Sequence, residues 1–275
     1  MSVGSIYKRP FGRFIIVILQ KLGVFRMVNR FLKSPLSRKI IPRYIDRHQI
    51  DMRDFEGQEY RSFAEFFARK RDGVPCDEAP GMLISPCDGL LTIYPITEDM
   101  NIPMKNSHYR LTDLVPDEEA AGRLIDGVCM VFRLRASDYH HFCAFDDAEV
   151  VGSSYIKGQL HTVQPIACEK VPVYRLNRRW WSVLDTLHFG TAVQVEVGAM
   201  LVGGVRFAKK QGRYSRGEEM GNFELAGSTI LLMLSSDVRK QLRLEEKFKT
   251  AHIASSGIPI IMGEGIGVLS DETQS

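Results

Sequence analysis

Apolar side chains recur at helical spacing in the first part of this chain, at Phe11, Phe14, Ile15, Ile18, Leu22 and Phe25. Arg9 and Arg13 fall on the other side of this stripe, whereas Ile16 and Val17 blur it. The spacing is typical of an amphipathic helix.

A second apolar helical face is expected further along, within Tyr60–Arg71. Phe63, Phe66 and Phe67 stand there at i, i+3 and i+4, so they share one face, which we expect to pack against the next domain. We therefore predict a mainly helical region over residues 1–72, interrupted by prolines 35 and 42.

From residue 73 onward, short apolar runs alternate with glycine, proline and asparagine, which is typical of a β-rich domain. The predicted strands are 90–96, 128–134, 150–156, 192–205 and 229–234, with a short helix near 116–124 and a last strand after the turn at 263–267. Residues 237–249 are predicted to form a solvated helical turn or a mobile loop. The predicted fold class is α+β, with a helical region (1–72) before a β-rich domain (73–275).

Positive charge is concentrated at the N-terminus. The whole chain carries a net charge of +3, but residues 1–50 hold eleven lysines and arginines against one acid, Asp46. Such a segment attracts nucleic acid or anionic lipid, and the apolar stripe favours lipid. We expect a helix lying in a membrane interface with its bases toward the headgroups. The alternative is an amphipathic helix packed on its own protein.

The apolar run Phe14–Leu19 is far shorter than the roughly 20 residues needed to cross a bilayer. No small-residue cleavage site of a signal peptide follows it. The five cysteines are scattered and lack zinc-ligand spacing, so we expect reduced thiols and no metal site. These features together predict a peripheral protein on the cytoplasmic face of the cell membrane.

The segment Gly227-Ser228-Thr229 carries the candidate chemistry. It follows a glycine-rich approach and runs into the apolar stretch Ile230–Leu234. The Ser228 hydroxyl is positioned to attack the Gly227 carbonyl, which has no side chain to shield it. The resulting ester can eliminate to a dehydroalanine, which hydrolyses to a pyruvoyl group, a built-in electrophilic cofactor.

At this point the chain resembles the phosphatidylserine decarboxylases, which depend on a pyruvoyl group and cleave themselves at Gly-Ser-Thr. Similar blocks occur in the same order: Ser62–Arg69, Ser85-Pro86-Cys87-Asp88-Gly89, Leu134–Phe142 and Val197–Gly203. The resemblance implies cleavage between 227 and 228 into chains 1–227 and 228–275, which stay together and are open to further dimerisation. It also implies decarboxylation of phosphatidylserine to phosphatidylethanolamine at an anionic membrane, without nucleic acid.

The resemblance also assigns a proton relay. Ser228 needs a base, and His140 supported by Asp88 occupies the family positions, with Asp138 as a second candidate carboxylate. Many members have another histidine three residues after the first, usually assigned to self-cleavage, where this chain has Cys143. Either His140 serves both reactions or another group contributes, and His161 is a plausible substitute.

Two other functions stay open at this stage. The chain is alternatively a non-catalytic lipid-binding relative, in which Cys143 marks lost activity, or a pyruvoyl decarboxylase of a soluble amino acid. Cleavage at Ser228 would distinguish the enzyme from the non-catalytic relative. A requirement of activity for residues 1–50 would distinguish a lipid decarboxylase from a decarboxylase of a soluble amino acid.

Overall fold

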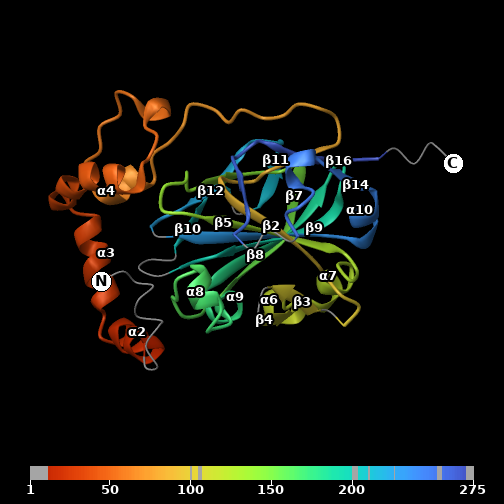
Figure 1. Cartoon of the computed structure of the whole chain (residues 1–275), viewed down its shortest axis with the longest axis horizontal. Coiled ribbons are helices and arrows are strands. Elements are labelled where there is room, and N and C mark those ends of the chain that lie inside the picture. Colours follow the sequence, from red (N-terminus) through yellow and green to blue (C-terminus); the bar gives the residue numbers. More distant parts are fainter. Residues whose placement is uncertain are drawn as a thin grey trace.

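The computed structural model describes residues 12–99, 101–104, 107–199, 204–209, 211–225, 227–252 and 256–270. Helices gather along one edge of a large twisted sheet and beneath it (Figure 1). The predicted α+β class is confirmed. The division at residue 72 stays a prediction.

One antiparallel sheet organises the described part of the chain. Its eight strands follow the order β11 (Gly212–Tyr214), β7 (Ala148–Ile156), β8 (Arg179–Thr186), β9 (Gly190–Val197), β13 (Ser228–Leu234), β5 (Val128–Leu134), β2 (Gly89–Pro95) and β15 (Ile258–Ile260). β13 lies between β5 and β9, and all seven of its residues are buried. Its apolar sequence fits this central place because both of its faces are covered.

Alternation along β13 divides the sheet into two faces. Ile230, Leu232 and Leu234 belong to the larger hydrophobic core, together with Leu134, the residue opposite Ser228. We call this side the Ser228 face. Leu231 and Met233 belong to a second core on the other side, which we call the Thr229 face.

A small sheet covers the Ser228 face. It consists of β10 (Val205–Phe207), β12 (Glu219–Phe223) and β6 (His141–Cys143). Phe142 and Phe223 from this sheet pack in the same core as Ile230 and Leu232. The rings of Phe142 and Phe223 lie 5.6 Å apart.

Short elements cover the Thr229 face, below the large sheet in Figure 1. They are the hairpin β3 (Asn101–Met104) and β4 (Ser107–Arg110), then α6 (Leu111–Leu114), α7 (Glu118–Gly122), α8 (Pro165–Cys168) and α9 (Val173–Leu176). Tyr109, Leu114 and Tyr174 pack there against Val131 and Val195 of the sheet.

A third sheet lies beside the C-terminal end: β1 (Met82–Ile84), β16 (Gly265–Leu269) and β14 (Leu242–Leu244). The last strand predicted after 263 is therefore confirmed as β16. The segment 237–249 contains α10 (Ser236–Gln241), β14 and η3 (Glu246–Phe248), so it is more ordered than the predicted turn or loop. Ser235 caps α10 by accepting a hydrogen bond from the Val238 amide.

The N-terminal elements are α2 (Gly12–Lys21), α3 (Val24–Leu32), η1 (Pro35–Ile40), α4 (Ile41–His48), η2 (Arg53–Phe55) and α5 (Phe63–Phe67). Gly23, at φ +74°, turns the chain between α2 and α3. α5 is shorter than predicted because Ser62 caps its first turn and Ala68 leaves helical geometry. Its phenylalanines are buried, as expected, in a cluster that includes Leu225.

The strand predicted over 192–205 ends earlier, at Val197. The Gly198 amide bonds to the Arg178 carbonyl, and the Gly198 carbonyl accepts from the Asn177 side chain, so the chain leaves the β9–β13 ladder here. β10 begins separately at Val205 in the small sheet. β8 was not among the predicted strands.

Candidate functional site

The bond between Gly227 and Ser228 lies at the N-terminal end of β13, a central strand of the large sheet. Ser228 is 1% exposed and pairs with Leu134 of β5. A Cβ placed on Gly227 would lie 3.6 Å from the Leu134 carbonyl oxygen and 3.6 Å from Cγ2 of Val163. Residue 227 therefore faces Val163, whereas the pairing with Leu134 directs Ser228 to the Ser228 face.

His140 is fully buried just before β6, in the connection that leads into the small sheet. Its Nδ1 lies 2.9 Å from the Asp138 carbonyl oxygen, which can only accept, so Nδ1 carries the proton. Nε2 is then a lone-pair acceptor, and it has no partner among the described residues. Burial lowers the His140 pKa to about 3, so the ring stays neutral.

Asp88 is buried close to His140 but is held by other groups. It accepts from the Arg71 guanidinium at 3.3 Å through each oxygen, from the Tyr139 amide at 3.2 Å and from the Met262 amide at 2.9 Å. The predicted His140–Asp88 hydrogen bond is absent among the described contacts. Asp88 acts on His140 through its charge, which raises the His140 pKa by less than burial lowers it.

Asp138 bonds to its own turn. Its carboxylate accepts from the Arg135 amide at 2.6 Å and pairs with the Arg135 guanidinium at 2.8 Å. The part of Asp138 that reaches His140 is its main-chain carbonyl. Asp138 therefore positions the His140 ring through its main-chain carbonyl, while its carboxylate bonds to Arg135.

His141 points away from His140 into contacts of its own. Its Nδ1 lies 3.0 Å from Glu219, its Nε2 lies 3.2 Å from the Ala68 carbonyl, and its ring stacks on Tyr139. These contacts link β6 to β12 and to the chain after α5. His141 therefore serves in packing between these elements.

Cys143, at the position of the missing histidine, is fully buried in the core of the Ser228 face. Its Sγ lies 3.8 Å from the Ser85 carbonyl, and burial raises the thiol pKa above its ordinary value. A neutral thiol in these surroundings is a packing residue and a poor proton carrier.

His161 lies near the cleavage bond, on the side that Gly227 faces. The Asn177 side chain bonds to both the amide and the carbonyl of His161, and also to the Gly198 carbonyl at 2.8 Å. Gly198 follows Val197, which pairs with Thr229. Nε2 of His161 lies 2.6 Å from Gln159. His140 and His161 thus approach the start of β13 from different sides.

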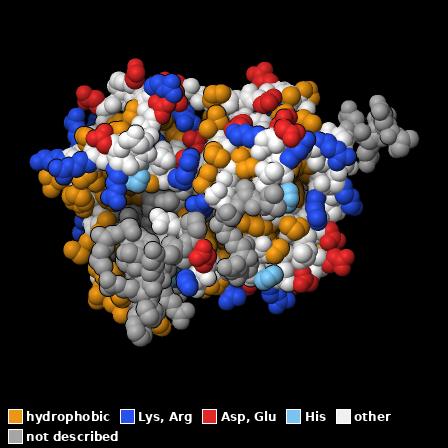
Figure 2. Space-filling view, in the orientation of Figure 1, with side chains coloured by type: hydrophobic (Ala, Val, Ile, Leu, Met, Phe, Trp, Pro, Cys, Tyr) orange, Lys and Arg blue, Asp and Glu red, His pale blue; other side chains and the backbone are white. Residues whose placement is uncertain are grey.

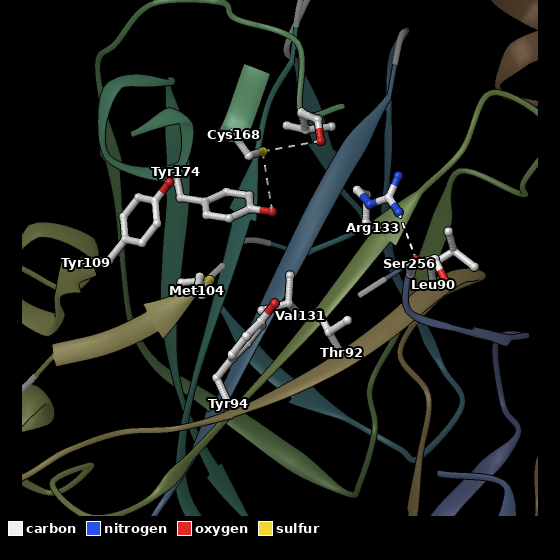
Figure 3. A pocket seen from close by; sticks show the side chains of 11 residues that line it. Leu90, Thr92, Tyr94, Met104, Tyr109, Val131, Arg133, Cys168, Tyr174 and Ser256 are labelled. Atoms are coloured by element: carbon white, nitrogen blue, oxygen red, sulfur yellow. Dashed lines mark hydrogen bonds between the residues drawn. The ribbon is translucent and has the colours of Figure 1, made fainter. Parts of the chain in front are cut away.

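A small cavity of about 30 Å³ lies on the Thr229 face (Figure 3). Its described lining comes from β2 and β5 of the sheet, from the short elements below and from the segment before β15: Leu90, Thr92, Tyr94, Met104, Tyr109, Val131, Arg133, Val163, Cys168, Tyr174 and Ser256. Val163 belongs to this lining and also lies beside Gly227. The cavity and the cleavage bond therefore share Val163 as a neighbour.

Several buried polar groups near the site had no motif to signal them in the sequence. Arg71 holds Asp88, and Arg133 stands opposite Thr229 in the sheet. Glu196, opposite Ile230, is fully buried and bonded to Gln194 at 2.8 Å, and burial raises its pKa to about 8. Gln194 and Glu196 alternate with valines along the sequence of β9, but this alternation does not reveal that both polar side chains are buried.

Exposed apolar side chains concentrate on the N-terminal elements. They are Phe14, Ile15, Ile18, Leu22, Met27, Phe31 and Leu36. Lysines and arginines lie among them, and both kinds of side chain are visible along this edge in Figure 2. Among the described residues no helix is long and apolar enough to span a membrane.

α2 also packs on the protein. Ile16 is 1% exposed in a small core with Val163, Ala167 and Ala199, and Phe25 packs at its edge. Among the described side chains of α2, Ile16 points inward, which explains why it does not fit the exposed apolar stripe. The exposed apolar residues around it point outward. Phe11 and Arg9 lie outside the described residues.

No group of three or more histidine, cysteine, aspartate or glutamate side chains in the described ranges is arranged to hold a metal ion.

A family model described as phosphatidylserine decarboxylase matches residues 63–267. The chain is 35% identical over 269 residues to phosphatidylserine decarboxylase proenzyme 2 of Clostridium acetobutylicum, covering 97% of this chain and 91% of that protein. It is 32% identical to the phosphatidylserine decarboxylase proenzyme of Clostridium novyi, covering 95% and 90%. The proenzyme of Clostridium perfringens strain SM101 is 34% identical, with 85% and 82% covered.

The chain belongs to the phosphatidylserine decarboxylase family. The resemblance seen in its sequence blocks is thereby confirmed.

Proposed function

We propose that this chain is the proenzyme of a pyruvoyl-dependent phosphatidylserine decarboxylase, which cleaves itself between Gly227 and Ser228 and then converts phosphatidylserine to phosphatidylethanolamine. One observation carries the proposal. A buried serine opens the central strand behind a glycine, while a buried, neutral histidine with an unpartnered Nε2 lies in the layer that covers the same face.

The cleavage chemistry balances without an external reagent other than water. The Ser228 oxygen adds to the Gly227 carbonyl carbon, and the C–N bond breaks to give an ester and a free amine. Loss of the α-proton expels the Gly227 carboxylate and leaves a dehydroalanine. Its imine form takes up water and releases ammonia, which leaves a ketone at residue 228.

The residues around the new terminus fit a pyruvoyl group. β13 holds residue 228 through its ladders to β5 and β9, and departure of Gly227 leaves space beside Val163. The Thr229 hydroxyl is buried and has no partner among the described residues, so it is available to the new group. A pyruvoyl carbonyl supplies an electrophile that binds the substrate amine and takes up the electron pair released with carbon dioxide.

We assign the base for Ser228 to His140. The fixed Nδ1 proton leaves Nε2 as the acceptor, and the Phe223 amide, five residues before Ser228, bonds to the His140 carbonyl at 2.9 Å. The charge of Asp88 favours the protonated ring that forms during attack. Arg71 in turn pairs with Asp88 and fixes the position of its carboxylate.

His161 is our candidate for the proton transfer that completes decarboxylation. Its loop contains Val163, which borders both Gly227 and the cavity. A histidine on this side can deliver a proton to the former α-carbon of a substrate that occupies the cavity. Cys143 takes no part in either step.

We also propose that the N-terminal elements hold the enzyme on an anionic membrane, at its cytoplasmic face. The outward apolar residues of α2 and α3 would enter the headgroup region, and the neighbouring bases would each add about 1 kcal/mol of attraction. Because Ile16 docks α2 beside Val163, the cavity lies next to the membrane-binding helix. This placement favours a lipid substrate over a soluble amino acid.

The two products of cleavage, 1–227 and 228–275, are expected to remain one heterodimer. β13 belongs to the second chain but is buried between two strands of the first. Further dimerisation stays open.

The test is the intact mass of Ser228→Ala beside wild type. We expect wild type to give two chains and the variant to stay a single chain without decarboxylase activity. Ser270→Ala, which removes a hydroxyl elsewhere in the second chain, is the matched control and should mature normally. Turnover by uncleaved Ser228→Ala would refute the proposal. An uncleaved wild type that still binds lipid would favour the non-catalytic alternative.

A further inference from the structure

We propose that Arg133 binds the phosphodiester of the phospholipid substrate inside the cavity on the Thr229 face, and that loss of Gly227 during self-cleavage joins this cavity to residue 228. The inference rests on the proposed function. It adds a binding residue and a path by which the substrate reaches the reactive group.

Among the described residues that line the cavity, Arg133 is the one cation, and none is acidic. Its side chain is half-buried, and Nη2 donates to the Ser256 carbonyl at 3.1 Å. It forms no ion pair with any carboxylate of the described residues. Figure 3 shows the guanidinium close to Ser256 at one end of the cavity.

A half-buried guanidinium without an anion favours binding of a negatively charged ligand, because an ion pair would recover the solvation it has lost. The planar donors of arginine match the paired oxygens of a phosphate or a carboxylate. Both groups occur in phosphatidylserine, so the reaction must decide between them.

Decarboxylation favours the phosphate. An arginine on the departing carboxylate would stabilise the ground state and lose this interaction as neutral carbon dioxide forms, which would raise the barrier. The phosphodiester keeps its charge throughout the reaction. Arg133 bound to it would hold the headgroup without opposing the chemistry.

The position of Arg133 suits this role. Arg133 stands opposite Thr229, one residue beyond the cleavage bond, and Leu90 pairs with it on the other side. In the substrate, two carbons and an oxygen separate the amine nitrogen from phosphorus. A headgroup held by Arg133 would therefore place its amine near residue 228.

Gly227 closes the path before cleavage. A Cβ built on Gly227 would lie 3.6 Å from Cγ2 of Val163, so the backbone of residue 227 runs beside this part of the cavity wall. When residue 227 becomes a free C-terminus, the bond to residue 228 no longer holds it there, and the space beside Val163 opens to residue 228. The remaining walls are mostly apolar, which suits the glycerol and first acyl carbons.

The test uses purified, processed enzyme and short-chain lipids below their micelle concentration, so that membrane binding does not contribute. Turnover of short-chain phosphatidylserine gives KM and kcat. Calorimetry measures the Kd of short-chain phosphatidylethanolamine, which keeps the phosphate but lacks the carboxylate. Arg133→Gln, Arg133→Lys and wild type are compared, with Arg213→Gln, an exposed arginine paired with Glu149, as the matched control.

We expect Arg133→Gln to mature normally and to raise both KM and Kd by the same factor, roughly tenfold to a hundredfold, with kcat little changed. Arg133→Lys should be intermediate, and Arg213→Gln should match wild type. Unchanged binding of phosphatidylethanolamine by Arg133→Gln would overturn the proposal, even if KM rose. If wild type failed to turn over, the proposed function would fail, but the calorimetric comparison would still decide the role of Arg133.

Discussion

The two faces of the large sheet differ sharply at the point where β13 begins. The Ser228 face is closed by the small sheet, and Ser228, His140 and Cys143 are buried. The Thr229 face has an open cavity lined in part by Arg133 and Val163, and Val163 follows His161 closely in the chain. The difference teaches how one strand can serve two reactions. Self-cleavage needs no outside reactant except water, whereas decarboxylation must admit a lipid.

The largest effects are expected when His140 and His161 are replaced separately, because each face is assigned a different reaction. We expect His140→Asn, which keeps a donor toward the Asp138 carbonyl, to slow self-cleavage by roughly a hundredfold or more. His161→Asn should mature at the wild-type rate but decarboxylate at least about tenfold more slowly. Gel analysis of cleavage against time, followed by turnover of the matured fraction, measures both. The reverse pattern would mean that the faces have been assigned wrongly.

The next test addresses how the open face meets the membrane. Ile18→Glu in α2 and Leu22→Glu just after it change residues that are 53% and 70% exposed, without touching inward Ile16. Each should weaken binding to anionic vesicles by about tenfold or more, because each removes a side chain whose burial contributes about 1.5–3 kcal/mol. Sedimentation with vesicles measures this. Leu187, which is 68% exposed in the turn between β8 and β9, supplies the control: Leu187→Glu should bind vesicles as wild type does. Equal losses of binding in all three variants would exclude α2 as the docking surface.

The closed face can also be probed through Glu196. Burial raises its pKa to about 8 in the folded protein, so the folded state keeps a proton that the unfolded chain releases above about pH 4.5. The free energy of unfolding should therefore be highest below that pH and fall as pH rises toward 8, by a few kcal/mol at most. Glu196→Gln should flatten this fall.

Urea unfolding at pH 5 and pH 8 measures the effect, in the Ser228→Ala background so that a single chain unfolds. Exposed Glu149→Gln serves as the control. The same loss of stability between pH 5 and pH 8 in Glu196→Gln as in its parent would show that Glu196 is not the group that titrates.

The smallest effect is expected at Cys143. Cys143→Ala should leave the cleavage rate within about twofold and cost about 1–2 kcal/mol of stability through the small cavity it creates. Time courses of maturation measure the first and urea unfolding the second. A large loss of cleavage without a loss of stability would make the thiol part of the relay.

Much of the fold was predictable because its pattern is local. The apolar runs that predicted strands at 128–134 and 229–234 and the phenylalanine face of α5 are local patterns, and the structure confirms them. β8 was missed because its sequence mixes tryptophans with polar residues. The early end of β9 depends on Asn177, which is distant in sequence.

The candidate site was predictable only as a set of residues. Motifs singled out Ser228, Asp88 and His140, but not that Arg71 holds Asp88 or that Asp138 reaches His140 through its carbonyl. Arg133 was not singled out because its role depends on register with Thr229 and on a cavity whose described lining comes from five separate segments. Such groups become visible only when the sheet is assembled.

The most direct test of the central claim is the N-terminus of the smaller chain in purified wild-type protein. The account predicts that a chain of residues 228–275 resists Edman sequencing and has the mass of a pyruvoyl terminus. Together with the larger chain, it should exceed the proenzyme mass by the difference between water and ammonia. A smaller chain that begins with an ordinary serine, in a preparation that decarboxylates phosphatidylserine, would contradict the account.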